Sequence, residues 1–152
     1  MTEVLFYHLE RQPLERILPS LLNKTLQRGW RALVRSSMPQ RLRPLSEAIW
    51  KWRDESFIPH GLDGEAHARM QPAWLTTEDE NPNGAKVLFC IDGTAPRDAE
   101  LAEMERVIVM FSGADPAAVE AARDLWRKLS GRSGLEMTYW RQNGRGQWEK
   151  KA

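Results

Sequence analysis

The apolar residues of this chain fall into short continuous runs, which are separated by longer segments with helical spacing. Nearly uninterrupted runs of β-branched and aromatic residues are typical of strands that are buried on both faces of a parallel sheet. We expect strands at residues 4–9, 30–35, 73–77, 86–91, 106–111 and 136–141, and a short extended piece at residues 56–59.

Helical spacing predicts a first helix that opens at Pro13, a residue suited to a first turn, and stops near Gly29. Pro19 lies inside this segment and predicts a kink or a short break, because proline removes a backbone hydrogen bond. A second helix is expected from about position 39 or 44 to position 52. The strand, helix and strand at the start of the chain form a βαβ unit, whose crossover we expect to be right-handed.

The second half of the chain carries clear boundary residues. Asp115 and Pro116 are a typical helix N-cap and first residue, and glycine at position 131 or 134 ends that helix. Residues 60–72 are predicted to form a loop, and residues 94–105 are expected to be partly helical. Asn143-Gly144 predicts a two-residue hairpin turn that pairs the last strand with residues 146–149.

Strands that alternate with helices indicate an α/β protein. We therefore predict one domain over residues 1–152, with a single, mostly parallel twisted sheet, helices on both of its faces and a C-terminal hairpin. A chain of 152 residues can bury a hydrophobic core without disulfides or metals.

Charge is segregated along the chain although the net charge is only +1. Residues 11–43 hold eight basic residues and one acidic residue, whereas residues 54–105 hold twelve acidic and three basic ones. Such segregation steers partners, but it does not resemble a strongly basic nucleic-acid-binding domain. The single cysteine, Cys90, is expected to be a buried thiol of a cytoplasmic protein, and we expect no membrane span and no secretory signal.

Catalytic and cofactor motifs are not found in the sequence. The turn after the first strand has no glycine, so neither dinucleotide nor Walker phosphate loops fit, and we expect no cofactor. The spacing of His60 and His67 matches no metal site, and both are interpreted as turn or loop residues. Asp92, next to Gly93 at a strand end, is interpreted as a turn residue rather than a catalytic acid.

Two aromatic clusters stand out among the seven tryptophans. Residues 49–61 mix Trp50, Trp52 and Phe57 with charged residues and end in Pro-His-Gly, which suits a protein-binding surface. Trp126 lies in the last helix beside Arg123, three residues earlier on the same side, and beside two further cations, Arg127 and Lys128. This arrangement suits an anionic peptide with an apolar end, stacking of single-stranded bases, or a partly buried tryptophan among solvated charges.

In four places, taken in order, the chain resembles the chi subunit of bacterial DNA polymerase III holoenzyme. They are the opening strand with Phe6-Tyr7, the Ile49-Trp50 pair followed by residues 55–60, the Asn-Pro-Asn-Gly turn at 81–84, and the arginine-rich last helix that leads into Thr138-Tyr139-Trp140. The most specific of them is residues 49–60. Together these places span almost the whole sequence.

The resemblance implies a non-catalytic accessory subunit with Rossmann-like topology and no bound nucleotide. Members of the family connect the clamp loader, through the psi subunit, to the acidic, Phe-terminated tail of single-stranded-DNA-binding protein, so contact with DNA is indirect. By the same resemblance Arg123 and Trp126, the latter at a position that is commonly Tyr in the family, bind this tail, and Trp50 and Phe57 bind psi or an equivalent partner. We add Arg127 and Lys128 to the tail site on charge alone.

Two alternatives from other classes remain open from the sequence. The first is a module that binds single-stranded nucleic acid directly through exposed Trp and Arg. The second is an enzyme acting on a small molecule, for which we would expect a pocket at the carboxyl ends of the strands.

Overall fold

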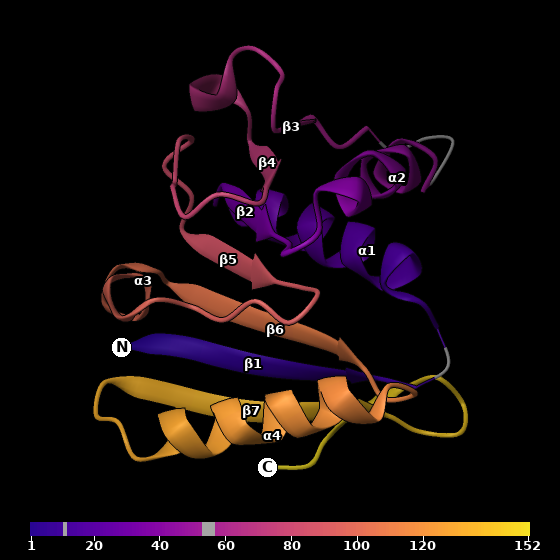
Figure 1. The fold of residues 1–152 in the computed structure, drawn as a ribbon, viewed down its shortest axis with the longest axis vertical. Helices are drawn as coiled ribbons and strands as arrows, with labels where there is room; N and C mark the ends of the chain where they lie inside the picture. The colour runs from indigo at the N-terminus through magenta and orange to yellow at the C-terminus, as the bar shows by residue number, and fades with distance from the viewer. Residues whose placement is uncertain (11, 53–56) are drawn as a thin grey trace.

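The computed structural model describes residues 1–10, 12–52 and 57–152, and it confirms the predicted α/β fold. Its strands form one sheet in the order β3-β4-β2-β5-β6-β1-β7-β8, in which every neighbouring pair is parallel except β7 and β8 (Figure 1). The strands are β1 (Thr2–Leu9), β2 (Ala32–Arg35), β3 (His60–Leu62), β4 (Ala73–Thr76), β5 (Val87–Cys90), β6 (Arg106–Ser112), β7 (Leu135–Gln142) and β8 (Trp148–Lys150).

Helices cover both faces of the sheet, as predicted. On one face α1 and α2 bury their leucines against the strands, and on the other face α3 and α4 do the same with a separate cluster of side chains. The helices are α1 (Leu14–Gln27), α2 (Pro39–Trp50), α3 (Asp98–Glu103), α4 (Pro116–Ser130) and the short 3-10 helix η1 (Ala68–Met70).

Strand β1 illustrates why a continuous apolar run was the right signal for a central strand. It lies between β6 and β7, and its alternate side chains enter different cores. Val4 and Phe6 are fully buried in the cluster under α3 and α4, whereas Leu5, Tyr7 and Leu9 belong to the cluster on the α1 side. Both faces of β1 therefore carry apolar residues.

Four details differ from the sequence prediction. Strand β3 occupies the start of the segment that was predicted to be a loop, and the helix α1 is continuous through the buried Pro19. Strands β1 and β2 flank the first helix in sequence but are not neighbours, because β5 and β6 lie between them. The hairpin has a three-residue loop rather than a two-residue turn: Asn143 pairs with Gln147, and the positive φ falls at Gly146 instead of Gly144.

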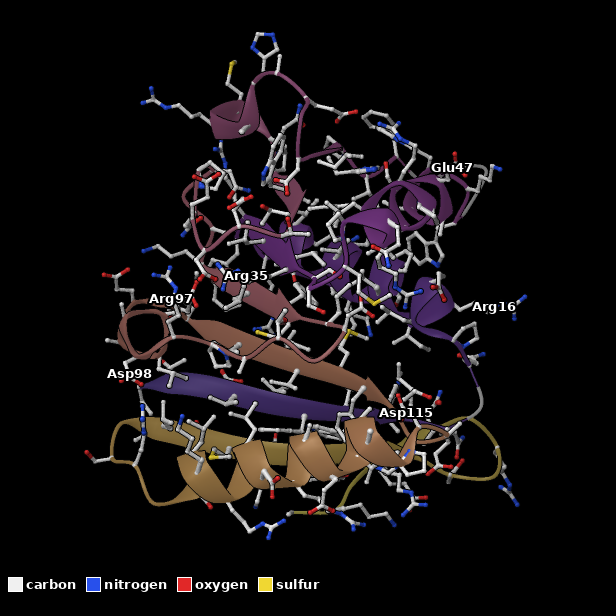
Figure 2. All side chains as sticks on the ribbon, viewed as in Figure 1. Arg16, Arg35, Glu47, Arg97, Asp98 and Asp115 are labelled. Atoms are coloured by element: carbon white, nitrogen blue, oxygen red, sulfur yellow. The ribbon has the colours of Figure 1, made fainter. Side chains whose placement is uncertain are left out.

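A buried ion pair joins the sheet to the region before β6. Arg35 of β2 donates two hydrogen bonds to Glu100 of α3, at 2.9 and 2.8 Å, and both side chains are almost fully buried. Glu100 also accepts a hydrogen bond from the backbone N–H of Arg97, the N-cap of α3. Figure 2 shows Arg35 and Arg97 lying close together beside α3. The polar groups of this pair are thus mutually satisfied, as burial requires.

Cys90 is a buried thiol, as predicted. Its complete burial raises the pKa of the thiol to about 12, so the thiol is neutral and unreactive near neutral pH. None of the helices in the described ranges is long and apolar enough to cross a membrane.

Candidate functional site

The last helix, α4, forms one side of a pocket of about 590 Å³ at the β7 edge of the sheet. Asp115 begins the helix as predicted, because its carboxylate accepts hydrogen bonds from the N–H groups of Ala117 and Ala118. Ala122 and Leu129 anchor the helix in the core, and Trp126, three to four residues from each, lies at the edge of the same helical face, where it borders the pocket. We call this the α4–β7 pocket; its lining residues are His8, Arg123, Trp126, Arg127, Tyr139, Arg141, Lys151 and Ala152.

Trp126 is the aromatic wall of the α4–β7 pocket, and it is half-buried. Its indole makes T-shaped contacts with the fully buried Phe6, at 5.3 Å between centroids, and with Tyr139, at 5.7 Å. Each such aromatic pair contributes about 0.5–1.5 kcal/mol beyond its area burial. The wall is therefore held in place by the sheet before any ligand arrives.

The two predicted arginines of α4 both line the pocket, but they differ in how they are paired. Arg127 lies 2.9 Å from Asp124 and 3.6 Å from Glu120, so carboxylates of its own helix already offset its charge. Arg123 is exposed, and within the described ranges no carboxylate lies within ion-pair distance of its guanidinium. Arg123 is thus the α4 cation most available to an anionic ligand. Lys128, added to this group on charge alone, is exposed but does not line the pocket.

The sequence did not predict four further side chains of the pocket lining, because strand pairing brings them to the pocket. They are His8, Tyr139, Arg141 and Lys151. The parallel register of β1 and β7 sets His8 beside Arg141 and pairs Tyr139 with Phe6, and the rings of both Phe6 and Tyr139 contact Trp126 of α4. Arg141 Nε lies 2.7 Å from Glu10 Oε1, which fixes the guanidinium at the rim. Lys151 arrives from the segment after β8. No local motif in the sequence signals these four positions.

His8 and Tyr139 form the polar floor of the pocket. His8 Nδ1 lies 2.8 Å from the Tyr139 hydroxyl, and Nε2 lies 3.0 Å from Glu10. Burial, and then the positive charge of Arg141, lowers the pKa of His8 despite Glu10. The imidazole fits because residue 113 is glycine: a Cβ there would lie 2.3 Å from His8 Nε2.

Trp50 and Phe57 form a second exposed aromatic patch at the other edge of the sheet. Their ring centroids lie 5.1 Å apart, and the side chains are 43% and 72% exposed. His60 supports them: its ring lies 4.2 Å from Trp50, and Ser46 and the Ile58 carbonyl hydrogen-bond its two nitrogens at 2.8 Å. We call Trp50 and Phe57 the aromatic patch.

His60 corrects an expectation, since it is a buried strand residue and not a turn residue. The adjacent Gly61 is required by packing, because a Cβ there would meet the Trp74 ring at 2.7 Å. The Pro-His-Gly sequence therefore begins an edge strand. Positions 53–56, which carry the charges between Trp52 and Phe57, lie outside the described residues.

The α4–β7 pocket and the aromatic patch lie at opposite edges of the sheet. His60, which supports Trp50, belongs to β3, whereas Tyr139 and Arg141 belong to β7. The strands β4, β2, β5, β6 and β1 lie between these two. With neighbouring strands about 4.8 Å apart, the two surfaces are separated by about 30 Å. One rigid sheet thus presents two distinct surfaces.

A second cavity, of about 600 Å³, lies at the carboxyl ends of β1, β5 and β6. This is the position at which the alternative of a small-molecule enzyme predicts a pocket. Its lining is mainly apolar, and three of its charged groups, Glu15, Arg41 and Asp92, pair with one another, while Asp115 caps α4. Ser36 Oγ donates to Asp92 at 2.6 Å, and Arg41 lies 3.4 Å from the same carboxylate and also pairs with Glu15. Asp92 is the turn residue that the sequence predicted, with φ 53° before Gly93.

The two histidines that were weighed as metal ligands lie in different elements. His67 is the N-cap of the short helix η1, with a left-handed φ of 65°, whereas His60 is the first residue of β3. In the ranges that the structure describes, no three His, Cys, Asp or Glu side chains are grouped to hold a metal ion.

Residues 1–138 match the family described as DNA polymerase III chi subunit, HolC. A relative, the probable DNA polymerase III subunit chi of Rickettsia prowazekii (strain Madrid E), is 25% identical over 112 residues. The match covers 73% of this chain and 66% of the relative, slightly less than two thirds of that protein. Most of the C-terminal hairpin lies beyond residue 138, where the family match ends.

Proposed function

Because this chain belongs to the DNA polymerase III chi subunit family, whose members are replication accessory subunits, we propose that it links the polymerase complex to single-stranded-DNA-binding protein. In this proposal the α4–β7 pocket binds the acidic, Phe-terminated tail of that protein. The aromatic patch binds a clamp-loader subunit, either psi or its equivalent. The chain acts as an adaptor without catalysis, and its contact with DNA is indirect.

The α4–β7 pocket is the observation that carries the proposal. A peptide that ends in a Phe carboxylate needs an aromatic wall for its ring and a cation for its charge. Trp126 offers the wall, and Arg123 on the same helix, which has no carboxylate partner in the described part of the chain, offers the cation. Acidic residues before the Phe would meet the positive charge of Arg127, which Asp124 and Glu120 partly offset. Planar guanidinium groups bind carboxylates in a two-point geometry, which also sets the direction of the peptide.

The arrangement of the two surfaces supports the adaptor role. Opposite edges of one sheet, about 30 Å apart at ordinary strand spacing, allow two partners to bind at once without a clash. The aromatic patch is exposed and lies outside both cores, which suits a contact that the chain makes with another protein.

Titration calorimetry with a short synthetic peptide tests the tail site. The peptide carries several aspartates followed by apolar residues and a terminal Phe. Charge-assisted hydrogen bonds contribute about 1.5–3 kcal/mol, so Arg123→Ala should weaken binding about tenfold or more. Arg16→Ala is the matched control, since this exposed arginine lies on α1 and points away from the sheet (Figure 2). Equal affinity of the Arg123→Ala variant and wild type would overturn the assignment.

Salt dependence gives an independent check, because exposed charges are screened as ionic strength rises. We expect wild-type affinity for the peptide to fall with added salt. The Arg123→Ala variant should show a shallower dependence, since one of the ionic contacts is already lost.

Direct binding of single-stranded nucleic acid is the alternative function. It draws on the same pocket, because a tryptophan beside an arginine can also stack a base. This alternative predicts that oligonucleotides alone bind the chain, with a steep salt slope. Tight oligonucleotide binding that Trp126→Ala abolishes, without peptide binding, would favour it over the adaptor role.

A further inference from the structure

The C-terminal hairpin forms the side of the α4–β7 pocket that faces α4. Pairing with β7 continues beyond β8, because the Lys151 N–H donates to the Tyr139 carbonyl at 2.7 Å and the Tyr139 N–H donates to the Ala152 carbonyl at 3.2 Å. The end of the hairpin is thereby fixed against the strand that carries the pocket floor. Figure 1 shows the final segment running back toward α4.

The register of the hairpin separates its two neighbouring lysines. Residues that pair across antiparallel strands point to the same face of the sheet. Lys150 pairs with Trp140, so Lys151 shares the face of Tyr139 and lines the pocket. Lys150 faces the opposite side and does not line the pocket.

The cations of the hairpin retain capacity for an anionic ligand. Arg141 uses Nε for Glu10, at 2.7 Å, but its side chain is 51% exposed and a guanidinium has five N–H donors. Lys151 Nζ lies 3.9 Å from Glu149 Oε2, which is too long for a direct hydrogen bond. Both side chains therefore have donors to offer.

We infer that Arg141 and Lys151 form a second cationic wall, which binds the acidic residues that precede the terminal residue of the peptide. This inference rests on the proposed function. In this arrangement Arg123 of α4 binds the terminal carboxylate of the peptide, and the hairpin, on the other side of the pocket, binds the acidic residues before it. Both residues lie beyond residue 138, outside the segment that matches the chi family. The hairpin thus makes binding depend on the acidity of the tail as well as on its end.

Two peptides with the same terminal Phe separate these contributions. One carries aspartates before the apolar residues, and the other carries asparagines in their place. Exposed ion pairs contribute up to about 1 kcal/mol, so Lys151→Gln and Arg141→Gln should each weaken binding of the acidic peptide by about threefold to fivefold. Neither variant should change binding of the asparagine peptide by a comparable factor.

The chain supplies a matched control for each variant. Lys150→Gln removes the same charge one residue away on the other face, and Arg145→Gln removes an arginine from the hairpin loop, outside the pocket. Fluorescence anisotropy with labelled peptides measures all affinities at one salt concentration. Both controls should bind the acidic peptide like wild type.

The outcomes distinguish this inference from the proposed function. Arg123-dependent binding in which Lys151→Gln and Arg141→Gln behave like the controls would overturn the hairpin wall and leave the tail site standing. Equal losses for variants and controls would also overturn it, since only net charge would then matter. Binding of neither peptide by wild type would overturn both the tail site and the wall.

Discussion

The indole of Trp126 packs edge-to-face against the ring of Phe6, with 5.3 Å between the ring centroids and 76° between the ring planes. Phe6 is fully buried in β1, so the centre of the sheet fixes the wall of the pocket. A preformed wall is the setting in which a tryptophan dominates binding. We expect Trp126→Ala to weaken binding of the Phe-terminated peptide by about thirtyfold or more, the loss of affinity typical of a hot-spot residue. Titration calorimetry with the same peptide measures this loss of affinity.

Trp148 offers a control for this prediction, since it is also half-buried and also packs edge-to-face, against Tyr7 at 4.9 Å. It lies on the opposite face of the sheet, with the α1-side core. Trp148→Ala should therefore keep the peptide affinity even where it lowers stability. Comparable losses in the two variants would mean that the effect of Trp126→Ala is a general destabilisation.

The Arg35–Glu100 pair predicts a strong dependence of stability on one carboxylate. Removing one partner of a buried ion pair costs about 3–5 kcal/mol, and Arg35 keeps a bond to the Glu78 carbonyl at 2.9 Å. Because this remaining hydrogen bond partly satisfies Arg35, we expect Glu100→Gln to lower the free energy of unfolding by about 3 kcal/mol, the lower end of that range. In a chain of this size that corresponds to a fall in Tm of about 6–12 °C, which calorimetric melting measures.

Asp98, two residues earlier in α3, is the matched control. It pairs with Arg132 at 2.7 Å, but this pair lies at the surface, where ion pairs contribute little. Asp98→Asn should leave the melting temperature nearly unchanged. Similar shifts in the two variants would mean that burial of the Arg35–Glu100 pair is not what makes it matter.

Acid should weaken the contribution of Glu100. Burial favours its neutral form, but hydrogen bonds from Arg35 and from the Arg97 backbone outweigh burial and lower the pKa of Glu100. Because the pKa of Glu100 is lower in the folded protein than in the unfolded chain, its carboxylate stabilises the fold at pH values above the unfolded-state pKa. This stabilisation is lost as the pH falls through the folded-state pKa. The stability of wild type and of Glu100→Gln should therefore converge in acid.

Much of the fold was predictable from local patterns because those patterns report burial directly. The continuous run of β1 and the Asp115-Pro116 start of α4 each need only neighbouring residues to be recognised. The edge strand β3 was missed because three residues carry no periodic signal. The order of the strands, with β5 and β6 between β1 and β2, depends on packing across the whole domain.

The residues of the candidate site also fall into two groups: those that a local sequence pattern predicts, and those that only the tertiary fold brings together. Arg123 and Trp126 are three residues apart on one helix, so their shared face follows from helical geometry. His8 and Arg141 are brought together by the register of two strands that are distant in sequence. The pairing of Arg127 with Asp124 and Glu120 depends on side-chain rotamers, which the sequence pattern leaves open. Charge alone therefore could not distinguish the paired Arg127 from Arg123.

Histidines on the two candidate surfaces should make the protein less stable in mild acid. Burial is the largest cause that lowers the pKa of both His8 and His60, and the hydrogen bond to the Ile58 carbonyl only partly opposes it at His60. A lowered folded pKa means that the unfolded chain binds protons first as the pH falls below about 6.5. Stability should thus rise with pH across this window.

Nuclear magnetic resonance titration of the imidazole signals tests this directly. We expect His8 and His60 to titrate below the ordinary histidine value of about 6.5. Urea unfolding should show lower stability at about pH 5.5 than at about pH 7.5, and His60→Gln should reduce the difference. A titration of His60 above the ordinary value would contradict the burial argument.

The aromatic patch gives the last prediction. Trp50 and Phe57 are exposed in the isolated chain, with their rings 5.1 Å apart, so they can be buried together by one partner. If that partner is a clamp-loader subunit, Trp50→Ala and Phe57→Ala should each weaken capture of the clamp-loader complex by about thirtyfold, as expected for interface hot spots. Affinity capture from purified components, with wild type beside each variant, measures this loss.

Met70 is the control for that experiment, because it is also a large exposed apolar residue, 71% exposed, but lies in η1 away from the patch. Met70→Ala should capture the complex like wild type. Peptide binding at the α4–β7 pocket should stay unchanged in all three variants, since the pocket lies at the other edge of the sheet. Full capture by both aromatic variants would remove the patch from the interface, whereas loss of capture together with loss of peptide binding would indicate a damaged fold.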